Sequence, residues 1–225
     1  MPKIAQLDLR KRCHVVVAVR DDVDMSQVTA ALASGADMIE LRVDQFSSTS
    51  KDHVLNEIAR YKDVTTLATI RCEWEGGEWQ DSESQRLALY RELLPHVDAV
   101  DIELSAGEIV ADVIEAAQAL KKTVLGSFHN FNATPSPQQL NDILDDGKQR
   151  GVDIVKIAAY CQSPQDLKVL TQFTVEHTHE NLIVIGMGPY AKASRIFFPL
   201  LSSLLTYTFL GVPSAPGQLN CEETL

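Results

Sequence analysis

The chain has 225 residues, of which 45% are hydrophobic and 23% are charged, a balance typical of a soluble globular domain. With 20 Lys and Arg residues against 31 Asp and Glu residues, the formal net charge is -11. A negative field of this size repels nucleic acid and anionic membranes, so we expect neither as a partner. An anionic small molecule would need a local cluster of Arg or Lys.

The same sequence carries no pattern for export, membrane insertion or cross-linking. We recognise no signal peptide, and no apolar stretch approaches the roughly 18 residues that span a bilayer. The four cysteines are irregularly spaced without a CxxC pair, which argues against a disulfide framework or a zinc site. We therefore expect one domain over residues 1–225, located in the reducing cytoplasm and without a bound metal.

Apolar, β-branched runs of strand length recur along the chain, separated by segments with helical spacing. The predicted strands are Cys13–Val19, Met38–Val43, Thr66–Ile70, Ala99–Leu104, Thr123–Phe128, Val152–Ile157, Leu182–Met187 and Leu204–Phe209. The predicted helices are Gln27–Ser34, Asp52–Tyr61, Ser82–Leu94, Gly107–Leu120, Pro137–Gln149 and Gln165–His177. We expect Ser26 to cap the first helix and Ser136 with Pro137 to open the fifth. The stretch GVPSAPGQLNCEETL is rich in Pro and Gly and predicts a final loop with a short tail.

Strands that are almost continuously apolar are typical of a parallel sheet covered on both faces. About eight β-α units in strict alternation predict a closed (β/α)8 TIM barrel, a single-domain α/β fold. An open doubly wound sheet is the alternative, and it usually carries a Gly-rich phosphate turn after an early strand. The first turn here, Val19 to Asp22, has no glycine and two acidic residues, which favours the barrel.

Ionisable side chains gather where five consecutive strands end. Because strand side chains alternate between two faces, these polar groups share one face and their apolar neighbours take the other. In a barrel they converge on the mouth formed by the carboxyl ends of the strands, where barrel enzymes carry out their chemistry. The converging residues are Glu40, Arg42, Arg71, Glu103, His129 and Lys156.

Lys156 and His129 are the strongest candidates for catalysis in this set. Burial and nearby cations disfavour the charged form of a lysine and free its amine to attack a carbonyl carbon. Histidine transfers protons near neutral pH, so an imidazole one strand away from an amine suits imine chemistry. For each residue alone a structural role is the simpler explanation. Lys156, for example, could place its ammonium group in water or pair it with a carboxylate such as Glu103.

Arginines and one loop complete the predicted site. Arg42, Arg71 and Arg195 could hold an anion, since a guanidinium can grip a carboxylate through two hydrogen bonds. The loop RCEWEGGEW contains Glu75, followed by Gly76 and Gly77 as possible hinges, and two tryptophans, Trp74 and Trp79, that could cover a ligand. A structural salt bridge and an ordinary exposed connection remain the alternatives.

Taken together, the motifs resemble those of the type I 3-dehydroquinate dehydratases, the class I enzymes of the shikimate pathway. They occur in the family's order and span nearly the whole chain. The matching segments are Glu40-Leu41-Arg42-Val43-Asp44, Arg71 with Glu75-Gly76-Gly77, Asp101-Ile102-Glu103-Leu104, Ser127-Phe128-His129-Asn130-Phe131, Val155-Lys156-Ile157, Met187-Gly188 through Ser194-Arg195, and Ser214-Ala215-Pro216-Gly217-Gln218.

The resemblance implies a TIM barrel, usually a homodimer, that needs neither a metal nor an organic cofactor. It implies that Lys156 forms a Schiff base with the C3 ketone of 3-dehydroquinate, and that His129 moves protons with help from Glu75. It also implies that Arg195 holds the substrate carboxylate. The remaining contacts, to the hydroxyls and the ketone region, would come from Glu40, Arg42, Arg71, Ser214 and Gln218.

Two other functions remain open from the sequence. A class I aldolase would use the same fold and a Schiff-base lysine, but one acting on sugar phosphates needs a phosphate cradle near the last two strands. A barrel that only binds a small carboxylate, as a sensor or scaffold, would not require Lys156, His129 and Glu75 together.

Overall fold

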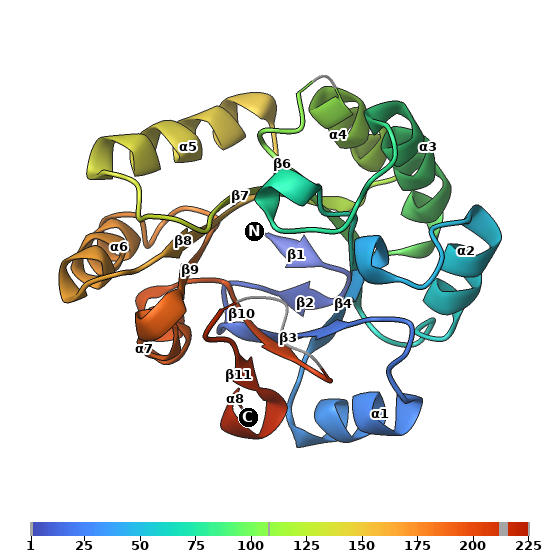
Figure 1. The fold of residues 1–225 in the computed structure, drawn as a ribbon, viewed down its shortest axis with the longest axis horizontal. Coiled ribbons are helices and arrows are strands. Elements are labelled where there is room, and N and C mark those ends of the chain that lie inside the picture. The colour runs from blue at the N-terminus through green and yellow to red at the C-terminus, as the bar shows by residue number, and fades with distance from the viewer. Residues whose placement is uncertain (1, 108, 212–215, 225) are drawn as a thin grey trace.

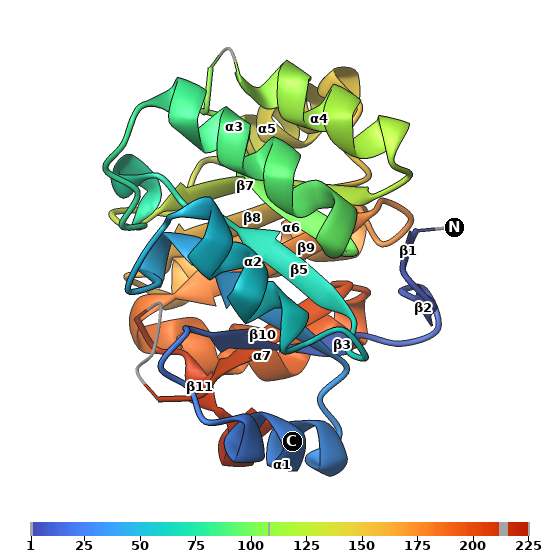
Figure 2. The same ribbon diagram turned by 90° about the vertical axis from the view of Figure 1, so that its right-hand side faces the viewer.

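Eight parallel strands, β3 to β10, form a barrel, and helices pack around it, as Figures 1 and 2 show. The computed structural model describes residues 2–107, 109–211 and 216–224. Within these residues the predicted (β/α)8 barrel is confirmed. Its strands are β3 (His14–Val19), β4 (Met38–Arg42), β5 (Thr66–Thr69), β6 (Ala99–Glu103), β7 (Thr123–Asn130), β8 (Ile154–Tyr160), β9 (Leu182–Met187) and β10 (Leu205–Phe209).

The six predicted helices are also present, with bounds shifted by a few residues. Two short helices near the C-terminus were not predicted. The helices are α1 (Met25–Ser34), α2 (Lys51–Ala59), α3 (Glu83–Leu93), α4 (Ile109–Ala119), α5 (Pro137–Arg150), α6 (Pro164–Glu176), α7 (Ala191–Phe197) and α8 (Cys221–Thr224). Single 3-10 turns lie at η1 (Val43–Gln45), η2 (Glu73–Glu75), η3 (Leu94–His96), η4 (Gly188–Tyr190) and η5 (Phe198–Leu201).

Polar caps fix where several helices begin. Ser136 caps α5, as predicted, by accepting a hydrogen bond from the backbone N–H of Gln139. The cap predicted for α1 is wrong: Asp24, not Ser26, precedes the helix, and its carboxylate accepts from the backbone N–H of Ser26. Asp and Ser are both good N-caps, so the sequence alone did not distinguish the two positions.

Aspartates at the amino-terminal end of the barrel set the register between pairs of strands. Asp37, Asp98 and Asp153 each precede an alternate strand: β4, β6 and β8. Their carboxylates accept the backbone N–H of Val15, Thr66 and Val124 on the neighbouring strand, at 2.8, 3.0 and 2.8 Å. Each such bond aligns two strands at their starts and therefore also at their carboxyl ends.

Alternating side chains divide the core into an interior layer and an outer layer. Val16, Met38 and Leu67 belong to the interior cluster, where they fill the lower part of the barrel. A hairpin of β1 (Lys3–Ile4) and β2 (Leu7–Asp8) contributes Ile4 and Leu9 to the same cluster. The lower barrel is therefore a packed floor, and polar side chains that face inward have space only toward the carboxyl ends of the strands.

The barrel closes at a seam between β9 and β10. In the described part of the chain these two strands share no hydrogen-bonded ladder, although the backbone N–H of Leu204 donates to Leu182 O at 3.0 Å. Side chains supply further links, since the Ser203 hydroxyl accepts from the backbone N–H of Val184 at 3.1 Å. The seam is therefore held partly by side-chain hydrogen bonds.

The expectation of a loop and tail at the C-terminus is wrong for residues 219–224. Leu219–Asn220 forms a ninth parallel strand, β11, beside β10, and α8 follows it. The Thr208 hydroxyl donates to Leu219 O at 3.0 Å, which brings this segment back to the rim of the barrel.

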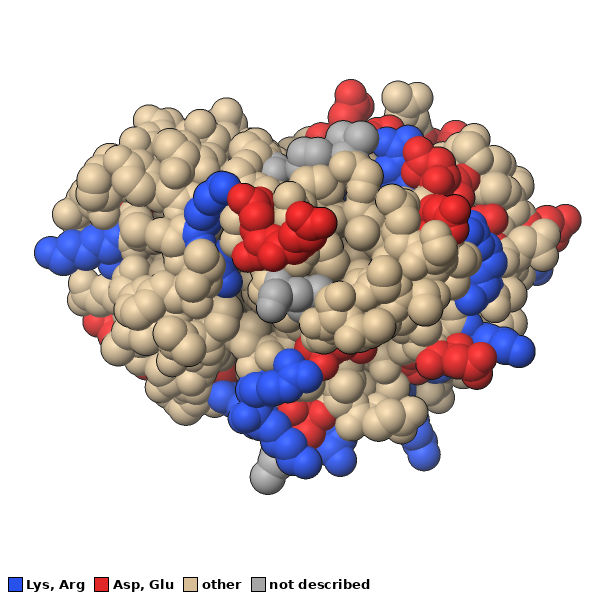
Figure 3. Space-filling view, turned by 90° about the horizontal axis from the view of Figure 1, so that it is seen from below, with Lys and Arg blue, Asp and Glu red and all other residues tan. Residues whose placement is uncertain are grey.

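The surface is mixed in charge. Figure 3 shows Lys and Arg side chains scattered among Asp and Glu side chains on the face it presents. Among the helices described, none is long and apolar enough to cross a membrane. The four cysteines, Cys13, Cys72, Cys161 and Cys221, are free thiols.

Candidate active site

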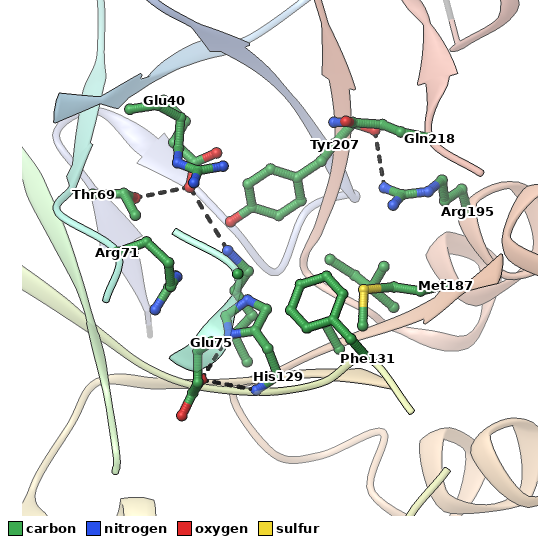
Figure 4. A pocket seen from close by; sticks show the side chains of 15 residues that line it. Glu40, Thr69, Arg71, Glu75, His129, Phe131, Met187, Arg195, Tyr207 and Gln218 are labelled. Carbon is green, nitrogen blue, oxygen red and sulfur yellow. Dashed lines mark hydrogen bonds and ion pairs between the residues drawn. The ribbon is translucent and has the colours of Figure 1, made fainter. Parts of the chain in front are cut away.

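The inward-facing side chains at the carboxyl ends of the strands line a cleft of about 510 Å³ including its open mouth (Figure 4). Eight of the nine residues that the sequence analysis assigned to catalysis or substrate binding are described, and all eight line it. The lining residues are Glu40, Arg42, Thr69, Arg71, Glu75, Gly76, His129, Phe131, Lys156, Ala158, Ile185, Met187, Arg195, Tyr207 and Gln218. The ninth candidate, Ser214, lies outside the described residues.

Lys156 projects from β8 into the floor of this cleft. Its Nζ lies 2.9 Å from Asp101 Oδ2 and 3.7 Å from Glu40 Oε1, and 4.4 Å from the centre of the Tyr207 ring. The carboxylate paired with the amine is thus Asp101, whereas the sequence suggested Glu103. Lys156 is 5% exposed and lines the cavity, so this ion pair lies inside the site.

His129, on the neighbouring strand β7, forms a second pair with Glu75. Glu75 Oε2 lies 2.9 Å from both the backbone N and the ring Nδ1 of His129. An ionised carboxylate can only accept hydrogen bonds, so this contact places the ring proton on Nδ1. The Nε2 lone pair is then available to a molecule bound in the cleft. Ser105, on the loop after β6, donates its hydroxyl proton to the other carboxylate oxygen, Oε1.

The pKa values of this pair are shifted toward the neutral forms. Burial raises the pKa of Glu75 to about 7, against the opposing effects of the Ser105 hydrogen bond and the Arg71 charge. Burial, together with the positive charges of Arg71 and Lys156, lowers the pKa of His129 well below its usual value. An unprotonated imidazole is therefore maintained near neutral pH, as a general base requires.

Arg71 crosses the barrel interior and connects three neighbouring strands. Its guanidinium donates to Asp101 Oδ1 and to Ser127 Oγ, both at 2.7 Å, and lies 3.0 Å from Glu103 Oε1. This cation, the nearby Lys156 and hydrogen bonding overcome the burial of Asp101 and hold its pKa well below the usual range. Asp101 therefore remains a carboxylate in contact with both cations.

Glu103 does not converge on the cleft as the sequence suggested. Its two oxygens are occupied by Arg71, by the backbone N–H of Cys72 at 2.8 Å and by Arg86 at 2.8 Å. Arg86 reaches this position from α3 and is fully buried. The Glu103–Arg86 ion pair packs against Arg71 on the side away from the cleft. Glu103 therefore holds Arg71 in position without lining the cavity itself.

Glu40 and Arg42 lie on β4, two residues apart on the interior face. Arg42 makes a paired contact with Asp44, at 3.1 Å from Nε and 2.8 Å from one terminal nitrogen. Glu40 accepts from the Thr69 hydroxyl at 2.8 Å. Each partner fixes the side chain while leaving it on the cavity surface, where it can meet substrate hydroxyls.

Arg195 differs from the other buried cations of the site because no carboxylate neutralises it among the described residues. Within those residues its guanidinium donates to Tyr207 O at 3.2 Å, and its Nε has no partner. Burial lowers the pKa of Arg195 to about 10, so it still carries its charge at neutral pH. A buried, unneutralised guanidinium on a cavity wall is suited to bind an anion. Gln218, beside it on the rim, donates to Thr208 O at 3.2 Å.

The loop after β5 is organised differently from the expectation. Trp79 is buried in the outer core, and Trp74 is 61% exposed with its indole N–H donating to Ser105 at 3.3 Å. Neither tryptophan lines the cleft, so the predicted cover is wrong. Phe131 and Gly76 lie at the mouth instead, with the Phe131 ring stacked near His129 at a centroid distance of 6.4 Å.

No metal centre is found among the described residues, where no group of three His, Cys, Asp or Glu side chains is placed to hold an ion. What the cleft does bring together is an amine, a neutral imidazole held by a carboxylate, and an unneutralised guanidinium. This combination suits a small carboxylate with a carbonyl group, which the amine can attack while the imidazole transfers protons.

Comparison with known proteins gives consistent matches over nearly the whole chain. The family model described as type I 3-dehydroquinase matches residues 13–225. The 3-dehydroquinate dehydratase of Methanococcoides burtonii is 35% identical, covering 99% of this chain and 96% of its own length. That of Thermodesulfovibrio yellowstonii is 36% identical, covering 96% and 94%.

Solved structures give the same result. The crystal structure of 3-dehydroquinate dehydratase from Aquifex aeolicus matches with a TM-score of 0.84 at 33% identity, covering 94% of this chain and 95% of that one. The type I enzyme from Clostridium difficile, solved with covalently modified comenic acid, matches with a TM-score of 0.85 at 28% identity, covering 95% and 90%.

Proposed function

Because the chain belongs to the type I 3-dehydroquinase family, we propose that it converts 3-dehydroquinate to 3-dehydroshikimate through a Schiff base on Lys156, with His129 as general acid and base. Family membership makes it a hydro-lyase of the shikimate pathway. The observation that supports the mechanism is the placement of the Lys156 amine and the His129–Glu75 pair around one cleft.

The first stage forms the imine. The Lys156 ammonium first gives up a proton to Nε2 of His129. The free amine then attacks the C3 carbonyl carbon, and the carbonyl π electrons move to the oxygen, which takes up that proton. The resulting C3 hydroxyl leaves as water with a second proton, and the nitrogen lone pair forms a protonated C=N bond. His129 supplies and receives protons in these steps. The ring of Tyr207, whose centre is 4.4 Å from Nζ, also favours a cation at this nitrogen.

The second stage eliminates water from the ring. Nε2 of His129 removes a proton from C2, and the electrons of the C–H bond move toward the protonated imine, which acts as an electron sink. The electrons then return to form the C1–C2 double bond as the C1 hydroxyl departs, taking the proton that His129 carries. Hydrolysis of the imine consumes one water, regenerates Lys156 and releases the product. The net loss is one water molecule.

Glu75 serves this cycle by fixing the imidazole. Its Oε2 holds the proton on Nδ1, so that Nε2 is the atom that exchanges protons with the substrate. A neighbouring carboxylate also stabilises the imidazolium that forms after each proton abstraction. The His129 ring therefore alternates between two protonation states without changing its orientation.

The arginines and rim residues orient the substrate. Arg195 binds the substrate carboxylate, because it is the buried cation whose charge the described residues leave unneutralised. Glu40 and Arg42 contact hydroxyls from the opposite wall, Arg71 lies beside the ketone region, and Gln218 closes the rim. Ser214 belongs to this group through the family resemblance alone.

Borohydride reduction tests the proposal. With 3-dehydroquinate present, reduction should add a stable mass to the peptide that contains Lys156. The variant Lys156→Ala should lose both this adduct and turnover, followed by the ultraviolet absorbance of the conjugated product, while still binding substrate. The exposed Lys148, paired with Glu180, gives a matched control in Lys148→Ala. An adduct on another lysine, or turnover in Lys156→Ala, would refute the assignment.

Assembly and location form part of the same proposal. We infer a homodimer in the cytoplasm, as the resemblance implies. The α7–η5 surface supports association, because Ile196, Phe197 and Leu200 are 63, 48 and 78% exposed there. Light scattering should give twice the chain mass of 24.9 kDa, and a monomer mass at micromolar concentration would contradict this.

A further inference from the structure

Tyr207 places a phenol hydroxyl inside the cleft that none of the steps above uses. It projects from the interior face of β10 and is 4% exposed. Its hydroxyl has no hydrogen-bond partner among the described residues. Figure 4 shows the ring lying across the cleft with its hydroxyl directed toward Glu40 and away from Gln218.

A buried hydroxyl without a partner is unfavourable for the free protein. It has lost its hydrogen bonds to water and gained none in exchange, at a cost that phenylalanine at the same position would avoid. Tyrosine O–H groups usually find a partner when they are buried. A hydroxyl on a cavity wall finds that partner when a ligand enters.

From this geometry we propose that Tyr207 is a further substrate-binding residue, whose phenol O–H donates a hydrogen bond to a substrate oxygen at or beside the carbon that Lys156 attacks. The inference rests on the proposed function, since it takes Lys156 as the point of attachment. The ring centre is 4.4 Å from Nζ, so a molecule joined to that nitrogen must lie against this side chain.

The charges around the phenol determine which partner it selects. Glu40 and Asp101 act on it from β4 and β6, Arg71 from the segment that follows β5, and the Lys156 ammonium lies over its ring. Burial and the two carboxylates keep its pKa well above the usual value, so the group remains a neutral donor. A neutral donor favours a carbonyl or hydroxyl oxygen, while the substrate carboxylate is left to Arg195.

Tyr207→Phe is the variant that tests the proposal, because it removes the hydroxyl and keeps the ring over Lys156. We expect kcat/KM for dehydration to fall by about 10- to 100-fold, the usual effect of deleting one well-placed hydrogen bond to a substrate. We also expect the melting temperature of the free protein to stay the same or rise, because the variant removes a buried polar atom that has no partner.

Tyr61 provides a matched control. It is 2% exposed, its hydroxyl also lacks a partner among the described residues, and it packs in the outer core away from the cleft. Tyr61→Phe should therefore leave kcat/KM unchanged, with the same neutral or positive effect on melting temperature.

The two variants and the wild type separate the possible outcomes. Reduced kcat/KM with an unchanged or higher melting temperature in Tyr207→Phe alone supports the substrate contact. Kinetics within twofold of wild type would overturn it, and so would a loss of activity that parallels a loss of melting temperature. Wild-type turnover and the borohydride adduct on Lys156 are measured in the same series. Their absence would refute the proposed function, whereas their presence with an unaffected Tyr207→Phe would refute the Tyr207 contact alone.

Discussion

Glu75 accepts two hydrogen bonds from His129 on a single oxygen, with Oε2 lying 2.9 Å from both the backbone N and the ring Nδ1. Anchoring the backbone and the ring of one residue together fixes both the position and the tautomer of the imidazole. The base is therefore prepared before substrate binds, and its state depends on the protonation of Glu75.

That dependence predicts the acidic limb of the pH profile. The pKa of Glu75 is raised to about 7, so its carboxylate takes up a proton as pH falls through that value. The ionised form is the one that supports His129, hence kcat/KM, which reports the groups of the free enzyme, should decline below about pH 7 and level off above it. A limb centred near the usual glutamate value would contradict this assignment.

Ser105→Ala should move this limb upward. The Ser105 hydroxyl stabilises the Glu75 anion, so its loss raises the pKa of Glu75 further and shifts the acidic limb to higher pH. Ser105→Thr should restore the wild-type profile. Ser84→Ala, at an exposed hydroxyl that contacts Ser82, serves as the control and should show no shift. An unchanged profile in Ser105→Ala would show that this contact does not tune the pair.

Arg195→Gln should weaken substrate binding without weakening the fold. Losing a charge-assisted contact to the substrate carboxylate costs about 3 kcal/mol, which lowers kcat/KM by roughly 100-fold, mainly through KM. The melting temperature should not fall, because the variant removes a buried charge without a carboxylate partner among the described residues. Lys192→Gln, at an exposed position on the same helix, should leave KM unchanged. A normal KM in Arg195→Gln would place the carboxylate elsewhere.

Asp101→Asn should destabilise the protein strongly. The carboxylate is fully buried between Arg71 and Lys156, and removing one member of such a cluster costs about 3–5 kcal/mol of unfolding free energy. Urea denaturation measures the loss. The matched variant Asp112→Asn breaks an exposed pair with Arg91 and should cost about 0–1 kcal/mol. Equal effects at the two positions would mean that the buried cluster adds no stability.

Gly76→Ala should impair the cleft through its backbone. Gly76 has φ +78°, and an added Cβ would lie 2.4 Å from the Phe131 ring, which would have to move into the cavity. Gly107 also has positive φ, at +59°, but a Cβ there meets nothing within 4 Å. Gly107→Ala therefore shows the cost of backbone strain alone, about 1 kcal/mol. Activity should fall in Gly76→Ala and persist in Gly107→Ala; equal activities would refute the steric argument.

The sequence predicted the barrel because strands buried on both faces consist of apolar, β-branched runs that are easily recognised. Helix α7 was missed because its polarity does not follow its burial: Ser194 and Arg195 are buried on it, while the apolar Ile196 and Phe197 are exposed. Segment β11 follows a Pro- and Gly-rich stretch, and its pairing with β10 depends on a tertiary contact that no local pattern encodes.

The sequence likewise predicted which residues belong to the site but not all of the contacts between them. Alternation placed Asp101 and Glu103 on the same interior face, but it does not indicate which of them reaches the amine on a strand two positions away. Arg86 on α3 would pass for an ordinary exposed arginine, although it is fully buried against Glu103. Tyr207 lies within an apolar run, a position that predicts packing of its ring in the core and gives no sign that its hydroxyl faces a cavity. These assignments require the twist and stagger of the strands, which only the folded structure supplies.

The seam between β9 and β10 lies directly under Arg195, which follows β9 on α7 and donates to Tyr207 O on β10. The Arg195 side chain therefore links the β9 end of the curved sheet to its β10 end. A ligand that binds this guanidinium and holds it in place would also stabilise this link, so that ligand affinity and closure of the barrel would be thermodynamically coupled.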